Sequence, residues 1–236
     1  MPAELRAQNA GFSYGTTPVL RNVTISVPAG AQIGLTGPSG SGKTTLARIL
    51  AGLLPAEAGT VTRNGQPVRR AKGGPWGGIA MLFQSPRASC SPRLTLDRVI
   101  AEGLRGSRRK EADVRVRELA GQVQLTADLL GRYPREVSDG QLQRACLARM
   151  LAAEPDYLIC DEATAMLDAA TTALIVRVIS SEVAARGMGV LALSHDRTLL
   201  EAWCDAVTGL EALSAAGPGP GVGPRGSSLV AHTGLD

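Results

Sequence analysis

Cysteine is scarce in this chain of 236 residues, which contains only four. The cysteines form no CxxC pair and lack the density of a small secreted domain held together by disulfides. The sequence therefore argues against a disulfide scaffold and favours a reducing, cytosolic compartment. The four residues are Cys90, Cys146, Cys160 and Cys204.

Long apolar runs are also missing. No uninterrupted stretch approaches the roughly 18 to 20 apolar residues that a membrane-spanning helix needs. Residues 1–11 contain no apolar segment of the kind found in signal peptides. We therefore expect any membrane role to depend on a partner protein.

Dense positive charge is a third absence. Lysine and arginine outnumber the acidic residues by only 25 to 21, which gives a net charge of +4. Basic residues gather in two short clusters, at 63–72 and 105–110, whereas nucleic-acid-binding domains normally carry a denser basic stripe. We interpret both clusters as solvated surface and expect no nucleic-acid partner.

Hydrophobic residues make up 44% of the chain, enough for one domain with a helical lobe inserted into it. Apolar runs rich in β-branched residues alternate with segments of helical periodicity. This alternation predicts an α/β fold with a mostly parallel sheet covered on both faces. The expected strands are 23–27, 32–36, 79–83, 158–161 and 190–194, and the expected helices lie within 43–52, 96–130, 141–153 and 171–186.

Turn-forming residues divide the chain at two places. Pro28, Ala29 and Gly30 separate the first two expected strands, which predicts a hairpin at the start of the fold. After Leu213 the chain becomes rich in glycine, proline and serine, so we expect 214–236 to be a disordered tail. Residues 1–213 then form the folded domain, with a helical subdomain inserted at about 90–153.

A phosphate-binding loop lies between an expected strand and an expected helix, where it fits the pattern GxxxxGK[ST]. Its glycines allow backbone N–H groups to converge on phosphate oxygens, and the helix N-terminus adds positive potential. The lysine would reach the β- and γ-phosphates and the threonine would ligate Mg²⁺. The nucleotide is expected to contact Gly37, Pro38, Ser39, Gly40, Ser41, Gly42, Lys43, Thr44 and Thr45.

Two acids follow the expected strand at 158–161. Because parallel strands end at the same sheet edge, Asp161 would lie beside the phosphate loop, where it could hold Mg²⁺ through water. Glu162 could polarise the attacking water, since phosphoryl transfer depends mainly on positioning and charge stabilisation. Two adjacent acids can also be an ordinary helix N-terminal charge pair, but the nearby phosphate loop favours the catalytic interpretation.

Two further polar residues end expected strands. His195 follows the strand 190–194 and could reach the γ-phosphate, although a histidine in such a place is more often structural. Gln84 follows the strand 79–83, and its amide could reach metal or water. Both are retained as candidate catalytic residues, and Gln84 also as a metal ligand.

Together with Tyr14, the segment Ser138–Gln141 and the pair Leu167-Asp168, these motifs stand in the order seen in ATP-binding-cassette ATPases, and residues 3–210 resemble that family. The resemblance implies a P-loop NTPase core, an N-terminal antiparallel β subdomain and an inserted helical subdomain. It also implies roles for single residues: Tyr14 stacks on adenine, Gln84 couples the nucleotide to a transmembrane partner, Glu162 is the catalytic base and His195 contacts the γ-phosphate. Asp168 resembles the loop residue that touches the opposite subunit.

The resemblance assigns the segment Ser138, Asp139, Gly140 and Gln141 to another chain's nucleotide. In such cassettes this segment closes over ATP held by a second cassette, and it begins a helix whose N-terminus can bind an anion. Dimer closure on two ATP molecules, hydrolysis and reopening are the implied cycle. Taken alone, Ser138 could equally be an ordinary helix N-cap.

A narrower resemblance comes from the segments 83–86, 91–96, 100–104 and 132–136, which are similar to the cassettes of peptide, nickel and metallophore importers. It implies a peripheral protein on the cytoplasmic face of the membrane. The implied partners are a second, non-identical cassette, two transmembrane permease subunits and, indirectly, an extracytoplasmic binding protein.

The chain departs from the family pattern at several positions. Asp139 stands where most members have glycine, and Ala163 replaces the usual proline after the catalytic glutamate. A carboxylate at 139 would be repelled by a γ-phosphate unless it points away, by about 1 to 4 kcal/mol at 4 Å for effective dielectric constants between 80 and 20. We therefore hypothesise a heterodimer with unequal ATP sites.

Other functions remain open. A soluble cassette acting on nucleic acid or ribosomes normally carries two cassettes or a long coiled coil, and this chain shows one cassette and no sustained heptads. An exporter ATPase is a further alternative. A scaffold that binds ATP without turnover is disfavoured by Glu162 and His195.

Overall fold

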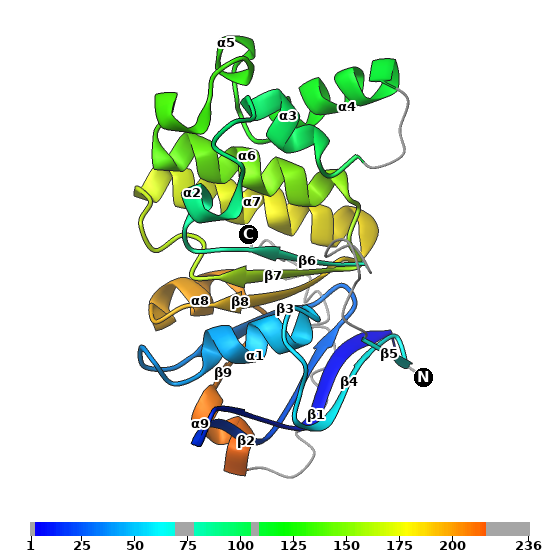
Figure 1. Cartoon of the computed structure of the whole chain (residues 1–236), viewed down its shortest axis with the longest axis vertical. Helices are drawn as coiled ribbons and strands as arrows, with labels where there is room; N and C mark the ends of the chain where they lie inside the picture. Colours follow the sequence, from blue (N-terminus) through cyan, green and yellow to red (C-terminus); the bar gives the residue numbers. More distant parts are fainter. Residues whose placement is uncertain (1–2, 69–77, 105–108, 216–236) are drawn as a thin grey trace, which may run out of the picture.

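The computed structural model describes residues 3–68, 78–104 and 109–215, which form two β-sheets and a set of helices (Figure 1). The larger sheet has the strand order β6-β7-β8-β3-β9, and its strands pair in parallel. Its three neighbouring strands β6, β7 and β8 are buried along their whole length, as expected for a sheet covered on both faces. The strand bounds are β3 Gln32–Thr36, β6 Ile79–Leu82, β7 Tyr157–Asp161, β8 Gly189–Leu193 and β9 Ala206–Gly209.

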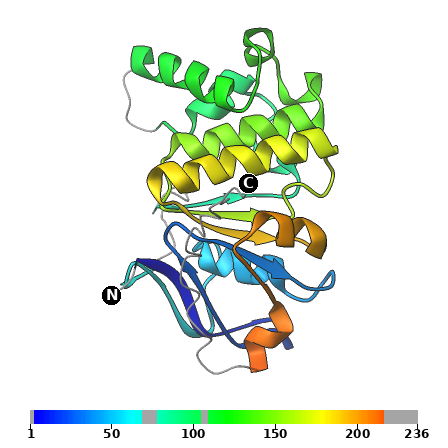
Figure 2. The ribbon, with the colours of Figure 1, turned by 180° about the vertical axis from the view of Figure 1, so that it is seen from behind.

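Alternate residues of these strands enter two separate cores, as the two-residue period of a strand requires. Leu158 and Cys160 of β7 pack in a cluster with helices α6 (Asp139–Ala152) and α7 (Ala169–Arg186). Tyr157 and Ile159 enter the other cluster, with helix α1 (Lys43–Leu50). Figures 1 and 2 accordingly show α6 and α7 side by side along one face of the sheet and α1 on the other. The predicted two-sided covering of a parallel sheet is confirmed.

The smaller sheet is antiparallel, with the order β2-β1-β4-β5. The hairpin predicted around Pro28 is wrong, because β2 pairs with β1 while β3 belongs to the other sheet. The turn itself exists, since the Ala31 N–H donates to the Pro28 carbonyl. After this turn the chain passes from the antiparallel sheet to the parallel sheet, where Ile33, Gly34 and Leu35 are buried between β8 and β9. The bounds are β1 Glu4–Tyr14, β2 Thr17–Pro28, β4 Ala58–Arg63 and β5 Gln66–Pro67.

Helices dominate the part of the chain that the sequence predicts to be helical. They are α2 (Pro86–Ser89), α3 (Leu96–Ala101), α4 (Arg109–Gln122), α5 (Ala127–Leu130), a 3-10 turn η1 (Pro134–Glu136) and α6. Helix α6 begins at Asp139, two residues before the predicted start, because Ser138 caps it. Leu142, Cys146 and Met150 lie four residues apart on its buried face, as their spacing predicts.

The C-terminal part of the described chain contains α8 (Arg197–Trp203), β9 and α9 (Leu210–Ala215). Helix α9 continues two residues past the boundary that we predict at Leu213. Most of the expected tail, residues 216–236, lies outside the described residues, as do parts of both basic clusters. Within the described ranges, no helix combines the length and the apolar character needed to cross a bilayer.

Candidate functional site

The predicted site residues gather where the parallel strands end. Leu193 of β8 pairs with Asp161 on one side and with Leu35 on the other, so the three strands reach the same level. Beyond that level the Glu162 N–H donates to the Leu193 carbonyl and the Ser194 N–H donates to the Leu35 carbonyl. The phosphate loop, the two acids and His195 therefore leave the sheet at a single edge.

The loop 37–44 has the backbone geometry that its glycines allow. Gly40 and Gly42 have φ angles of 78° and 104°, in the region that favours glycine. A Cβ at Gly42 would lie 2.9 Å from Val19 Cγ1 and 3.2 Å from the Val19 carbonyl oxygen. The loop consequently packs directly on β2, and no larger side chain fits at residue 42 without movement.

Lys43 is held inside the loop, with only 5% of its surface exposed. Its Nζ donates to the carbonyl oxygens of Gly37 and Pro38 at 2.7 and 3.0 Å, and it lies 3.7 Å from Glu162 Oε1. The Ser41 hydroxyl is buried, with no hydrogen-bond partner among the described residues. Because buried polar groups normally have partners, an unpartnered hydroxyl in the same loop as a buried ammonium fits the binding of an anion such as phosphate.

Thr44 and Asp161 meet beside the loop, with the Thr44 hydroxyl donating to Asp161 Oδ1 at 3.0 Å. Burial raises the pKa of Asp161, and the hydrogen bond from Thr44 opposes that shift. A hydroxyl and a carboxylate are hard oxygen ligands that suit Mg²⁺, which usually takes few protein ligands and completes its shell with phosphates and water.

Glu162 lies between a lysine and a histidine. Its Oε1 faces Lys43, and its Oε2 is 3.3 Å from Nδ1 of His195. Its side chain is 18% exposed, whereas that of His195 is 63% exposed. Glu162 also has a φ of 47°, a strained conformation for a residue with a side chain, of the kind that clusters at functional sites.

Three other predicted residues lie at the end of a strand, just after a strand and at the start of a helix. Tyr14 is half exposed at the end of β1, where its ring packs edge-on against Phe12 with centroids 5.0 Å apart. Its exposed half is accessible to solvent, which is compatible with stacking on a base. Gln84 is exposed just after β6, and Asp168 caps α7 by accepting hydrogen bonds from the Thr171 N–H and hydroxyl. These hydrogen bonds lower the pKa of Asp168.

The segment Ser138–Gln141 is separate from the phosphate loop. The Ser138 side chain accepts from the Gln141 N–H at 3.2 Å and the Gln141 side chain accepts from the Ser138 N–H at 3.0 Å, which is a capping box. Gly140 lies beside Thr171 of α7. Among the described residues, the hydrogen bonds and ion pairs given for this segment lie within it, along α6 and with Arg87, and none reaches the loop.

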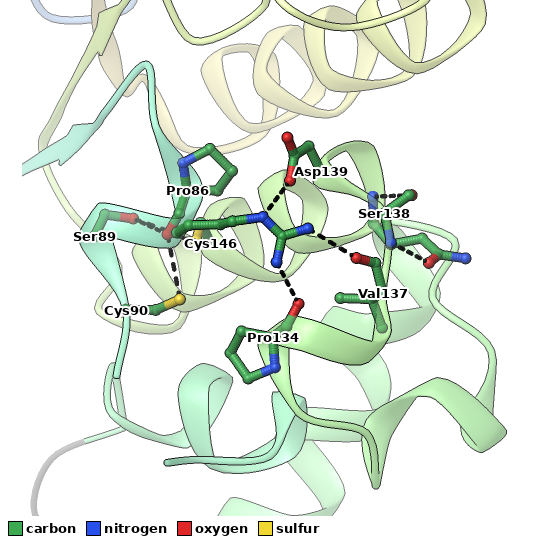
Figure 3. Close-up of polar contacts among 10 residues, drawn as sticks. Pro86, Ser89, Cys90, Pro134, Val137, Ser138, Asp139 and Cys146 are labelled. Carbon is green, nitrogen blue, oxygen red and sulfur yellow. Dashed lines mark hydrogen bonds and ion pairs between the residues drawn. The ribbon is translucent and has the colours of Figure 1, made fainter. Parts of the chain in front are cut away.

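Arg87 changes the expectation for Asp139. The sequence suggests an unpaired carboxylate, but Arg87 Nε lies 2.7 Å from Asp139 Oδ1 (Figure 3). The charge is therefore compensated within the chain, which removes the basis on which we hypothesise unequal ATP sites. Sequence reasoning missed Arg87, because only the fold brings α2 against the turn that leads into α6.

Gln143 is a second residue that the sequence did not single out. It is 1% exposed, and its Nε2 donates to the carbonyl oxygens of Phe83 at 3.1 Å and Ala163 at 2.8 Å. Phe83 precedes Gln84 and Ala163 follows Glu162, so one amide joins both loops to α6. The available signal was a polar residue three and four positions before Cys146 and Leu147, on a helix face that is otherwise apolar.

Comparison with known proteins identifies the same family that the motifs resemble. The family described as ABC transporter matches residues 20–165. A protein of Brucella abortus (strain 2308), provisionally named a peptide import ATP-binding protein, is 37% identical over 206 residues, which are 84% of this chain and 62% of that protein. A similarly named protein of Brucella ovis is 35% identical over 204 residues, 81% of this chain and 63% of the relative. The chain thus spans less than two thirds of these relatives.

Solved structures share the fold. The ATP-binding cassette MJ0796, described as a dimer bound to ADP and Pi in a post-hydrolysis state, has a TM-score of 0.79 at 24% identity, over 87% of this chain and 94% of that one. The cbiO1 protein of Clostridium perfringens, part of the complex cbiONQ, has a TM-score of 0.77 at 22% identity, over 89% of this chain and 85% of its own. Given the phosphate loop, the strand-end acids and the match over residues 20–165, the chain belongs to the ABC transporter family.

Proposed function

We propose that the chain is the ATP-binding and ATP-hydrolysing subunit of a membrane importer, working from the cytoplasmic face of the membrane. The observation that carries the proposal is the contact group at the sheet edge, in which Glu162 lies next to Lys43 and His195. The names of the Brucella relatives support import of peptides, and the sequence resemblance adds nickel and metal chelates as cargo classes.

Each residue of the group has a role that its geometry supports. Lys43 is poised to leave its loop carbonyls and neutralise the β- and γ-phosphates. Glu162 would orient and polarise the attacking water, and His195 and Gln84 would contact the γ-phosphate and that water. Thr44 and Asp161 would hold Mg²⁺, which when bound neutralises charge on the phosphate oxygens. Tyr14 would stack on adenine.

The proposed assembly pairs this cassette with a second, non-identical one beneath two permease subunits, with an extracytoplasmic binding protein delivering the cargo. The exposed capping box at Ser138 supports it, because within the described part of the chain the side-chain hydrogen bonds of this helix N-terminus stay in the capping box and do not reach the phosphate loop. In the pair, Ser138–Gln141 and Asp168 would face the partner. The solved MJ0796 cassette is itself described as dimeric.

The test compares Glu162→Gln with Glu118→Gln in the complex purified through a tag on this chain. Glu118 is an exposed residue of α4 that pairs with Arg115, so the control makes the same chemical change away from the site. Because positioned general bases contribute about 10² to 10⁴ in rate, Glu162→Gln should lower ATP hydrolysis by about 10² or more and trap ATP-bound complex. Glu118→Gln should hydrolyse ATP like the wild type.

Two results would contradict the proposal. Equal rates of ATP hydrolysis for Glu162→Gln and Glu118→Gln would show that Glu162 is not a catalytic residue. Purification of the chain with ribosomes or nucleic acid, and without membrane subunits, would replace the importer by the soluble alternative.

A further inference from the structure

Arg87 connects residues 83–85, which we call the Gln84 loop, to the turn that carries Ser138–Gln141. It lies on α2, three residues after Gln84 in the chain. We propose that Arg87 is a positioning residue for the Ser138–Gln141 segment, because it compensates the charge of Asp139 and holds the segment in the orientation that meets ATP on another cassette. This inference rests on the proposed function, which assigns that segment to a partner's nucleotide.

All three nitrogens of the guanidinium contact this turn (Figure 3). Nε lies 2.7 Å from Asp139 Oδ1, and the terminal nitrogens donate to the Pro134 carbonyl at 2.8 Å and the Val137 carbonyl at 3.1 Å. Pro134 lies in η1, and Val137 immediately precedes Ser138. A planar fork of donors can satisfy three acceptors at once, which the single ammonium of a lysine does less well. The contacts therefore fix the chain on both sides of the entry into α6.

Charge compensation is the second part of the role. The Asp139 carboxylate stands in the first turn of α6, beside the N–H groups that would face a phosphate. Left unpaired, it would repel the γ-phosphate of the partner's ATP, and the Arg87 guanidinium cancels its charge. The side chains of Arg87 and Asp139 are 47% and 55% exposed, and an ion pair so open to water adds little to folding stability. Its main effect is thus on orientation and local potential.

The same contact gives the Gln84 loop a route to Ser138. Residues of both segments line one cavity of about 270 Å³, among them Gln84, Arg87, Asp139 and Gln143. Arg87 lies directly after this loop, so a displacement of the loop would move the guanidinium that holds Asp139. In the proposed importer, Gln84 faces the transmembrane partner. Arg87 would transmit a displacement of the Gln84 loop to Ser138–Gln141.

The test is a double-mutant cycle in the purified complex. Arg87→Ala is measured in the wild-type background and in an Asp139→Gly background, with Arg135→Ala, an exposed arginine of the same turn, as the control. Arg87→Ala should lower the turnover number of ATP hydrolysis about tenfold when Asp139 is present and only about two- to threefold when it is absent, because the contacts with the Pro134 and Val137 carbonyls are lost in both backgrounds. Arg135→Ala should act like the wild type. Binding of a fluorescent ATP analogue to the chain's own loop should be unchanged by Arg87→Ala.

A merely structural role would give another pattern. Arg87→Ala would then lower hydrolysis equally in both backgrounds, together with the temperature of unfolding, and the proposal would be overturned. If Arg87→Ala does not fold, Arg87→Gln keeps side-chain donors without the charge, and its loss should depend on Asp139 in the same way. Arg87→Lys, which keeps the charge, should retain more turnover than Arg87→Gln, and the reverse order would also overturn it.

Lys43→Ala distinguishes a failure of the proposed function from a failure of the role proposed for Arg87. If Lys43→Ala leaves hydrolysis unchanged, the proposed function itself fails. If Lys43→Ala abolishes hydrolysis while Arg87→Ala has no effect, the proposed function stands and the role of Arg87 is refuted.

Discussion

The phosphate loop and the Ser138–Gln141 segment both lie at helix N-termini, yet their surroundings differ. Lys43 and Asp161 are each 5% exposed and lie among side chains and carbonyls of their own chain. Ser138 and Asp139 are exposed, and their polar groups are satisfied by the capping box and by Arg87. The first region is a site built within the chain, and the second is an exposed surface that we propose contacts a nucleotide on another chain.

Removing the buried lysine should break the first region and leave the second intact. Lys43→Ala deletes the ammonium that would neutralise the phosphates, so ATP hydrolysis should fall by about 10² or more, a loss typical for a lost charge-stabilising group. Hydrolysis and nucleotide binding in the purified complex are the measurements. Lys110→Ala, on the exposed face of α4, is the matched control and should change neither.

Substitution of a glycine in the phosphate loop should have the next largest effect, after substitution of Lys43. Gly42→Ala forces a side chain into a φ of 104° and against Val19, which should lower the free energy of unfolding by about 1 to 3 kcal/mol and weaken nucleotide binding. Urea unfolding checks the first effect. Gly121→Ala in α4 has open space around its Cβ and should be neutral or slightly stabilising. An unchanged Gly42→Ala protein would contradict the strained-loop geometry.

Gln143 tests the connection between the two regions, because it joins α6 to the residues beside Gln84 and Glu162. Gln143→Leu keeps the volume but leaves two carbonyl groups without their donor. The free energy of unfolding should fall by about 1 to 3 kcal/mol, measured by urea denaturation. Gln122→Leu, at an exposed position of α4, should stay within about 0.5 kcal/mol of the wild type. Equal changes in the free energy of unfolding for the two variants would show that the hydrogen bonds of Gln143 do not stabilise the contact between α6 and the two loops.

The smallest expected effect concerns the contact of α2 with α6. A hydrogen bond with Cys146 lowers the pKa of Cys90 to about 7, while burial raises the pKa of Cys160. The thiolate is the reactive form, so alkylation of Cys90 by iodoacetamide should rise with pH through about 7, and Cys160 should react far more slowly. Cys146→Ala should move the Cys90 midpoint to higher pH, as followed by mass spectrometry. An unmoved midpoint would contradict the contact.

The sequence predicts the first region well because its signals are local. The pattern of residues 37–44 and the acids after an apolar strand need only the rule that parallel strands end at one edge, and the structure places Lys43, Thr44, Asp161, Glu162 and His195 there. The parallel sheet with helices on both faces was predictable for the same reason. The strained φ of Glu162 was not, because no residue type announces it.

The second region is only half predictable. The sequence shows that Ser138 can cap a helix, but it does not show which side chain lies near Asp139, since Arg87 is far away in the chain. Chain separation also explains the wrong hairpin. Adjacency in sequence predicts that β2 and β3 pair, whereas β2 pairs with β1 and β3 lies in the parallel sheet.

The claim that Ser138–Gln141 acts on another chain's ATP can be tested by photolabelling. The purified complex is illuminated with an ATP analogue that carries a photoreactive group on its γ-phosphate, using wild-type chain and Lys43→Ala. The account predicts that Lys43→Ala removes the label from the peptide containing residues 37–44 and keeps it on the peptide containing Ser138–Gln141. Loss of both labels together would show that the segment contacts the chain's own nucleotide, and would contradict the account.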